Sequence, residues 1–336
     1  MILIYVFFND NLGSIVLSPT EYSNREKWEM TMNTVMIKTQ YWDIAANIYF
    51  PPGFDDNKQY PAIISAHPIG SCKEQTAGNV YGEALSKEGF VVIAFDRSTQ
   101  GQSGGEPRYT EDPSMAVEDF NRVTDYLVTL PYVDADRIGV LGICGAGGYA
   151  INATMIERRI KALVSITGVN YGRLCREGFS GFDPIGQMEA VAAQRTAEAK
   201  GEALQVDLFV PPSLEVAAEA GMTDVDVLGA TDYYRNRCVN DNAGTRALFS
   251  RRAASAAWDA FHLAETLLTT PMMVVVGDIP GGFGAYRDGL EIYARAASKV
   301  KELVVVEGYS HYDLYDQPEP VGQALGKLIP FFKTNL

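Results

Sequence analysis

Residues 137–150 read RIGVLGICGAGGYA, an apolar strand that runs into a glycine-rich turn and then a helix, with Cys144 at the tip of the turn. A turn this sharp forces its tip residue into strained backbone geometry and allows only small neighbours. Gly142 and Ala146 occupy the two small positions. The helix that follows points the positive end of its dipole at the sulfur, which favours the thiolate. The pattern predicts that Cys144 is mounted as a nucleophile.

Two other structures would produce a similar turn. Glycine-rich turns between a strand and a helix can bind phosphate, and a cysteine at a strand end can simply be buried against a helix. Residues 142–148 lack the lysine of a Walker loop and follow several predicted strands rather than the first. These differences disfavour a nucleotide site, whereas a structural cysteine has to be weighed against the rest of the chain.

The composition indicates a globular protein with an acidic surface. The chain has 336 residues, of which 47% are hydrophobic, and a formal net charge of −14. This charge disfavours nucleic acid and anionic membranes as partners, so we expect a small-molecule ligand. Four cysteines without a CxxC pair and three histidines form no metal-ligand pattern. We therefore expect no metal, no cofactor and a reduced, cytoplasmic protein; a homodimer is compatible with these observations.

Strands and helices alternate along most of the chain, which predicts an α/β fold with a mostly parallel central sheet and helices on both faces. Besides the strand that ends at Ile143, predicted strands cover residues 34–39, 44–50, 62–66, 91–95, 162–166, 272–276 and 303–306. Predicted helices of this part cover residues 77–87, 115–130 and 321–333.

The alternation stops for a long stretch before the strand at 272–276, which indicates an inserted cap rather than a loop. Helices are predicted in the cap at residues 184–203 and 250–268. The opening residues are apolar but lack a preceding basic region, so we interpret them as an added strand or a start-site appendage. The predicted units are an N-terminal extension at 1–32, a core at 33–168 and 269–336, and a cap at 169–268.

His311 has the position expected of a general base. It follows the last predicted strand, 303–306, after a short turn, so its ring could reach the sulfur of Cys144. In hydrolytic enzymes built on such a sheet, the nucleophile, the acid and the histidine follow in this order along the chain. His262 falls in a predicted cap helix, where packing is the expected role, and His67 is expected to order its own loop.

The acid of this arrangement is predicted from strand ends. Asp278 follows the strand 272–276 directly and would lie at the carboxyl edge of the sheet, beside the histidine loop. Asp288 is the alternative, although its place at a helix start suits N-capping equally well. We prefer Asp278 on strand-end geometry and expect Asp313, two residues after His311, to order the loop.

Two backbone N–H groups are predicted to bind a developing oxyanion. One donor in such sites follows the nucleophile, which here is Gly145, and the other comes from the loop after the third strand. That loop reads HPIGS at residues 67–71. Pro68 has no N–H, so Ile69 is the expected second donor, with Gly70 behind it.

Taken together, four stretches resemble dienelactone-hydrolase-like α/β-hydrolases: HPIGSCKEQT at 67–76, FDRSTQGQSGG at 95–105, GICGAGG at 142–148 and SHYDLYD at 310–316. The likeness spans about residues 34–332. It is strongest to a microbial group with cysteine in place of serine, whose members include thiohydrolases and acyl transferases of polyketide pathways. The resemblance implies an α/β-hydrolase fold and a cysteine nucleophile. Short dienelactone hydrolases lack so long an insertion, and their acid stands where this chain has Pro280.

These observations predict a hydrolase for an ester, lactone or thioester of a small, polyketide-like acyl group, acting through Cys144, His311 and Asp278. The alternatives are acyl transfer by the same acyl-enzyme and a scaffold that binds a small molecule without catalysis. Aromatic and large apolar residues of the cap are expected to line a pocket for the acyl group, or only to bury the cap. They are Tyr171, Phe179, Phe182, Met188, Phe209, Tyr233 and Tyr234.

Overall fold

The computed structural model describes residues 32–177 and 183–336. Eight strands form one sheet in the order β1-β2-β4-β3-β5-β6-β9-β10. β2 is antiparallel to both of its neighbours, and the six strands from β4 to β10 in this order are parallel. The strands are β1 (Met32–Ile37), β2 (Ile44–Tyr49), β3 (Tyr60–Ala66), β4 (Val91–Phe95), β5 (Val133–Ile143), β6 (Ile160–Ile166), β9 (Met272–Gly277) and β10 (Lys301–Val306).

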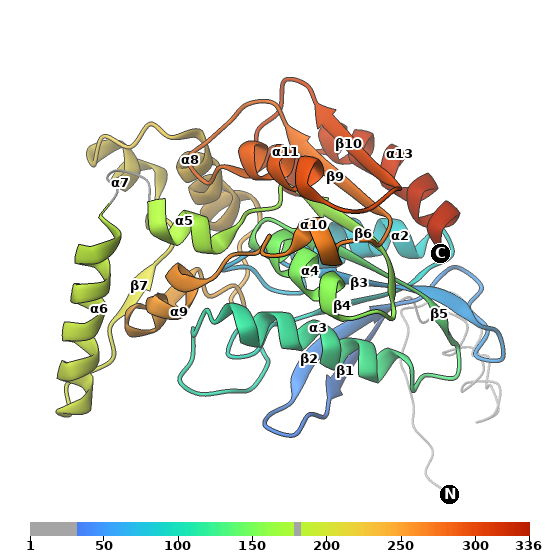
Figure 1. Cartoon of the computed structure of the whole chain (residues 1–336), viewed down its shortest axis with the longest axis horizontal. Helices are drawn as coiled ribbons and strands as arrows, with labels where there is room; N and C mark the ends of the chain where they lie inside the picture. Colours follow the sequence, from blue (N-terminus) through green and yellow to red (C-terminus); the bar gives the residue numbers. More distant parts are fainter. Residues whose placement is uncertain (1–31, 178–182) are drawn as a thin grey trace, which may run out of the picture.

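The central strands are apolar on both faces because helices cover both. On β3, Ile64 packs into one core cluster and Ile63 into the other, since successive side chains of a strand point to opposite faces. One cluster receives α3 (Pro113–Leu127), α4 (Gly145–Ile156) and α11 (Ala285–Arg295). The other receives the π-helical turn η1 (Thr76–Gly82), α2 (Glu83–Ser86), α12 (Asp313–Asp316) and α13 (Pro318–Asn335). The predicted α/β-hydrolase fold is confirmed (Figure 1).

Most of the segment between β6 and β9 projects beyond one end of the sheet, on the left in Figure 1, while its last helix lies over the core. Its short strands β7 (Val206–Leu208) and β8 (Arg246–Leu248) pair antiparallel. Its helices are α5 (Tyr171–Glu177), α6 (Pro184–Ala199), α7 (Leu214–Glu219), α8 (Val225–Asp232), η2 (Tyr233–Arg237), η3 (Phe249–Arg251), α9 (Arg252–Ala257) and α10 (Ala264–Leu267). We call residues 169–259 the cap, because Ala260, Phe261, Ala264 and Leu268 already pack in the core.

Two predicted cap helices end earlier than their patterns indicate. The helix predicted at 184–203 ends at Ala199, before Gly201 with a φ of +97°. The helix predicted at 250–268 is interrupted between Ala257 and Ala264. Within the interruption, the Asp259 carboxylate accepts the N–H of Phe261 at 3.0 Å, and such local bonds compete with helical ones.

The N-terminal extension predicted at 1–32 lies outside the described residues except for Met32, which begins β1. In the part of the chain that the structure describes, every helix is too short or too polar to cross a lipid bilayer.

Candidate active site

Cys144 lies between β5 and α4 with φ of 58° and ψ of −126°, the strained backbone expected of the turn. Its N–H donates to Ile166 O at 3.0 Å, and its carbonyl accepts the N–H groups of Gly147 at 2.8 Å and Val169 at 2.9 Å. Gly142 has no room for a side chain, because a Cβ would lie 2.3 Å from the carbonyl oxygen of Ala146. The glycines of the motif therefore let the chain turn tightly enough to hold Cys144 at the tip.

The Cys144 sulfur is buried where two backbone donors converge. The N–H groups of Gly145 and Ile69 both hydrogen-bond it, and so does the hydroxyl of Tyr315. Burial raises the pKa of the Cys144 thiol to about 11, despite these donors. The thiol is therefore protonated at neutral pH in the free protein. The structure thus brings together the predicted nucleophile and both predicted oxyanion donors.

The Ile69 loop is held from both the core and the cap. Ser71 N–H donates to Pro68 O at 3.1 Å, and Gly70 takes a φ of +78°. On the cap side, Thr245 N–H donates to Gly70 O at 3.0 Å, and the hydroxyl of Tyr234 bonds Ile69 O at 3.4 Å. These contacts fix the direction of the Ile69 N–H.

His311 lies in the loop after β10 and is buried. Its Nε2 is 3.1 Å from the hydroxyl of Tyr315, and its ring stacks on Tyr312. Burial lowers the pKa of His311 to about 3, so the ring is neutral at pH 7. Tyr315 hydrogen-bonds both His311 and Cys144, so it links the predicted base to the predicted nucleophile. Sequence reasoning missed this tyrosine as a site residue, although it lies four positions after the histidine.

The two carboxylates chosen from the sequence do not contact the histidine ring. Asp278 is exposed, and its Oδ1 accepts the N–H of Gly308 at 2.6 Å. Asp288 is buried in an ion pair with Arg173, at 2.7 and 2.8 Å. Among the described residues, His311 Nδ1 has no hydrogen-bond partner. The structure therefore gives neither aspartate the position of the acid.

A third aspartate, Asp226 of α8, lies beside the histidine instead. It is buried, and its Oδ2 accepts the N–H of Phe283 at 2.9 Å. Together with His311 it lines a cavity of about 10 Å³. Burial raises the pKa of Asp226 to about 7. The sequence carries no signal for this position, since Asp226 falls in the cap and looks like part of a helix start.

The other two histidines are not brought to the sulfur. Both ring nitrogens of His67 face the backbone, Nδ1 at 2.8 Å from Pro68 O and Nε2 at 3.3 Å from Arg97 N. This agrees with the loop-ordering role expected of it. His262 is exposed and follows α9 outside any helix. Asp313 accepts both the N–H and the hydroxyl of Ser310 at 2.7 Å and so orders the His311 loop.

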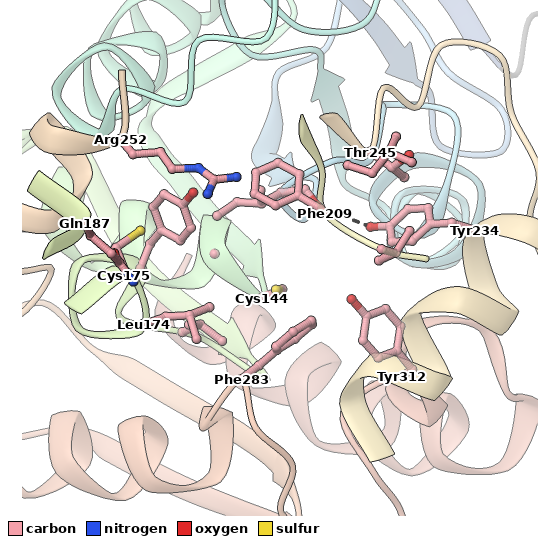
Figure 2. A pocket seen from close by; sticks show the side chains of 16 residues that line it. Cys144, Leu174, Cys175, Gln187, Phe209, Tyr234, Thr245, Arg252, Phe283 and Tyr312 are labelled. Atoms are coloured by element: carbon pink, nitrogen blue, oxygen red, sulfur yellow. Dashed lines mark hydrogen bonds between the residues drawn. The ribbon is translucent and has the colours of Figure 1, made fainter. Parts of the chain in front are cut away.

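A cavity of about 380 Å³ opens above the sulfur, between the cap and the core (Figure 2). Of the cap residues predicted to line a pocket, Tyr171, Phe209 and Tyr234 do so. Tyr233 instead bonds Thr76 N, whereas Phe179 and Phe182 lie outside the described residues. The remaining lining includes Leu174, Gln187, Val210, Arg252, Phe283 and Tyr312. Most of this lining is apolar or aromatic, as in sites for small organic ligands.

Within residues 32–177 and 183–336, no three histidine, cysteine, aspartate or glutamate side chains gather as a metal site would require.

Comparison with known proteins places the chain in a family. The family model of X-Pro dipeptidyl-peptidase (S15 family) matches residues 42–265. The chain belongs to the S15 family. Among its relatives, the uncharacterized protein YcjY of Escherichia coli (strain K12) is 39% identical over 298 residues, which cover 87% of this chain and 94% of YcjY. The crystal structure of PA2218 from Pseudomonas aeruginosa superposes with a TM-score of 0.78 at 28% identity, covering 92% of this chain and 95% of that chain.

Fungal enzymes of acyl chemistry are also similar to this S15-family chain. A thiohydrolase of Eupenicillium brefeldianum is 23% identical over 230 residues, 66% of this chain and 70% of its own length. Further fungal relatives are named as thiohydrolase and acyltransferase. These findings confirm an α/β-hydrolase with thiohydrolase and acyltransferase relatives. The closer likeness to dienelactone hydrolases, and cysteine as the nucleophile, stay predictions.

Proposed function

We propose that this protein hydrolyses esters, lactones or thioesters of small organic acids through a covalent acyl-enzyme on Cys144. The observation that carries the proposal is the convergence of the Gly145 and Ile69 N–H groups on the buried sulfur, at the floor of a largely apolar cavity. Two donors placed beside a nucleophile are what stabilises the oxyanion formed when it attacks a carbonyl carbon.

The proton of Cys144 has a path to the base. As the sulfur attacks, its proton moves to the hydroxyl oxygen of Tyr315, whose own proton moves to His311 Nε2. Burial keeps both the thiol and the imidazole neutral in the free protein, because it raises the pKa of Cys144 to about 11 and lowers that of His311 to about 3. The proton therefore moves during the attack and not before it.

The acyl group is then transferred in two steps. The C–S bond forms, the carbonyl oxygen becomes an oxyanion between the two N–H groups, and its collapse breaks the bond to the alcohol or thiol. The leaving group takes the proton from His311. A water molecule that gives a proton to His311 attacks the enzyme thioester, and the acid leaves as the proton returns to the sulfur.

Acyl transfer to an alcohol or amine is the second candidate function. It needs the same acyl-enzyme and only replaces water by another acceptor. The cavity of about 380 Å³ leaves room for an acceptor, and a fungal relative is named as an acyltransferase. Peptides are a less natural substrate, since a thiolate leaves more readily than an amine unless the amine is strongly protonated.

The test is intact-mass spectrometry with product release, on p-nitrophenyl esters, acyl thioesters and an X-Pro p-nitroanilide. We expect an acyl adduct on the wild type and a loss of turnover of about 10³-fold or more in Cys144→Ala. Cys238→Ala, a half-buried cysteine outside the cavity lining, is the control and should turn over normally. Substantial turnover by Cys144→Ala would remove the sulfur from the mechanism. Turnover of the anilide above the esters would favour a peptidase.

We also propose the cytoplasm as the location, which is supported by four cysteines that are all free. A homodimer stays a prediction, which sedimentation at micromolar concentration would test.

A further inference from the structure

The proposed base, His311, presents a buried ring nitrogen that needs a partner. If Nε2 is to accept a proton, the neutral ring must carry its hydrogen on Nδ1. His311 Nδ1 is buried and bonds to none of the described residues. A buried donor left without an acceptor costs free energy, and the charged ring formed during the reaction needs a counter-charge even more.

Two further polar atoms without partners in the described chain face the same place. They are Oδ1 of Asp226 and Oγ1 of Thr167. His311, Asp226 and Thr167 all line the cavity of about 10 Å³. A space of this size is about what one water molecule requires. The unpaired nitrogen and the unpaired carboxylate oxygen are complementary, because one donates and the other accepts.

We infer that Asp226 is the positioning acid of the site: across this cavity, through one water that Thr167 also binds, its carboxylate holds the Nδ1–H tautomer of His311. This inference rests on the proposed function, because it gives Asp226 a role only through the histidine. It replaces the acids expected after β9 with a residue of the cap.

The surroundings of Asp226 hold its carboxylate in this place. Its Oδ2 accepts the Phe283 N–H, and Gly281 has no side chain where a Cβ would lie 2.2 Å from the carboxyl carbon. Asp226 also lies in the first turn of α8, where the helix dipole favours a negative charge. The other titratable groups that face the pair are Asp224 on the cap, Tyr286 of α11, Cys144 at the turn, and Tyr312 and Tyr315 beside the histidine.

The pairing has a pH signature. Burial raises the pKa of Asp226 to about 7, so the carboxylate gains a proton as the pH falls below neutrality. A protonated Asp226 no longer stabilises the imidazolium of His311. The reactivity of Cys144 should therefore fall as the pH drops through about 7, and this fall should require Asp226.

The experiment compares Asp226→Asn with Asp224→Asn, a matched control. The Asp224 carboxylate binds the same loop, at Gly282 N, and caps the same helix, but it does not line the cavity that His311 and Asp226 share. We expect Asp226→Asn to lower kcat about 100-fold while KM stays within about twofold, so that kcat/KM falls by the same factor as kcat. The decrease in activity below about pH 7 should be absent from this variant. Asp224→Asn should stay within about threefold and keep the fall. Asp278→Asn, the acid chosen from the sequence, should also stay within about threefold.

Three results would overturn the inference. The first is a kcat/KM of Asp226→Asn within threefold of the wild type. The second is an equal loss of kcat/KM in Asp224→Asn, which would indicate that both residues only dock the cap. The third is a larger loss in Asp278→Asn than in Asp226→Asn. The rate of Cys144 alkylation by iodoacetamide, followed by peptide mass and divided by the rate of Asp226→Asn at the same pH, tests the pair without a substrate, and this ratio should fall towards one as the pH drops through about 7. If Asp226→Asn changes the alkylation rate by the same factor at every pH while substrates still acylate Cys144, the role of Asp226 is excluded and the proposed function stands. If the effect of Asp226→Asn on the alkylation rate disappears below about pH 7 but no substrate acylates Cys144, the role of Asp226 stands and the proposed function is excluded.

A measurement on the wild-type protein tests the inference even if Asp226→Asn fails to fold. The chain has three histidines, so ¹⁵N-histidine NMR resolves each ring, with His311→Gln to assign the signal. The Nδ1–H tautomer of His311 at pH 8 is the expected result. The Nε2–H tautomer would contradict the inference.

Discussion

At the scale of single residues, Tyr315 stands between the two side chains to which we assign the chemistry. Its hydroxyl bonds both His311 Nε2 and the Cys144 sulfur, so the proposed base would act on the thiol through another side chain. The ring is fully buried and packs edge-on against Tyr233. A rigid hydroxyl held this way can pass a proton along without moving.

We expect Tyr315→Phe to lower kcat about 10- to 100-fold at nearly unchanged KM, because it removes the proton path and no part of the cavity lining. Steady-state kinetics with a p-nitrophenyl ester measures this. The control is Tyr81→Phe, which removes a buried hydroxyl that bonds Leu314 O, next to Tyr315 in α12. Equal losses in both variants would indicate a loosened loop, and full activity of Tyr315→Phe would mean that His311 reaches the sulfur directly.

At the scale of elements, the turn between β5 and α4 depends on close backbone approaches. A Cβ on Gly148 would lie 2.3 Å from the carbonyl oxygen of Val169, which follows β6. A Cβ on Gly147 would lie 2.6 Å from Gly168 Cα. The first turn of α4 thus packs directly on the backbone at the start of the cap, and this contact sets the position of Cys144 relative to the cavity.

Gly148→Ala should therefore reduce the free energy of unfolding by about 1–3 kcal/mol, because the overpacked atoms are backbone and cannot move aside. The matched control is Gly326→Ala in α13, where nothing lies within 4 Å of the added methyl. Alanine is the better helix former there and should add up to about 1 kcal/mol. Urea unfolding followed by circular dichroism measures both. Shifts of the same sign would contradict the packing argument.

At the scale of the whole molecule, the cap completes the site that the core begins. Arg173 of α5 pairs with Asp288 of α11, a contact that docks the cap on the core through a buried ion pair. The cap supplies Phe209 to the wall of the larger cavity and Asp226 to the small cavity that His311 also lines. Under the proposed function, substrate selection and catalysis would therefore both depend on the position of the cap.

Phe209→Ala should raise KM about tenfold for aromatic or long-chain acyl esters and leave the acetyl ester unaffected, because a short acyl group does not reach this wall. Kinetics across a series of p-nitrophenyl esters measures the difference. Met188→Ala, a half-buried cap residue that does not line the cavity, serves as the control. A uniform change for all chain lengths would show that Phe209 supports the fold of the cap instead of selecting the acyl group.

Local patterns were enough to determine the parts of this protein whose cause is local. The alternation of strands with helices predicts a mostly parallel sheet covered on both faces, and the small residues around Cys144 predict the turn. The place of His311 follows from its strand. Each of these depends on neighbours in the chain, since backbone geometry and side-chain periodicity act over a few residues.

The tertiary structure alone decided which groups meet at the histidine. Asp278 follows the expected strand yet is exposed, whereas Asp226 arrives from a helix of the cap. The interruption of the helix predicted at 250–268 depends in part on such a contact, since the Asp259 carboxylate that bonds Phe261 N–H locally also accepts the side-chain amide of Asn170 across the fold. Contacts between segments far apart in sequence depend on how the cap packs on the core. The pattern of residues along either segment does not predict that packing.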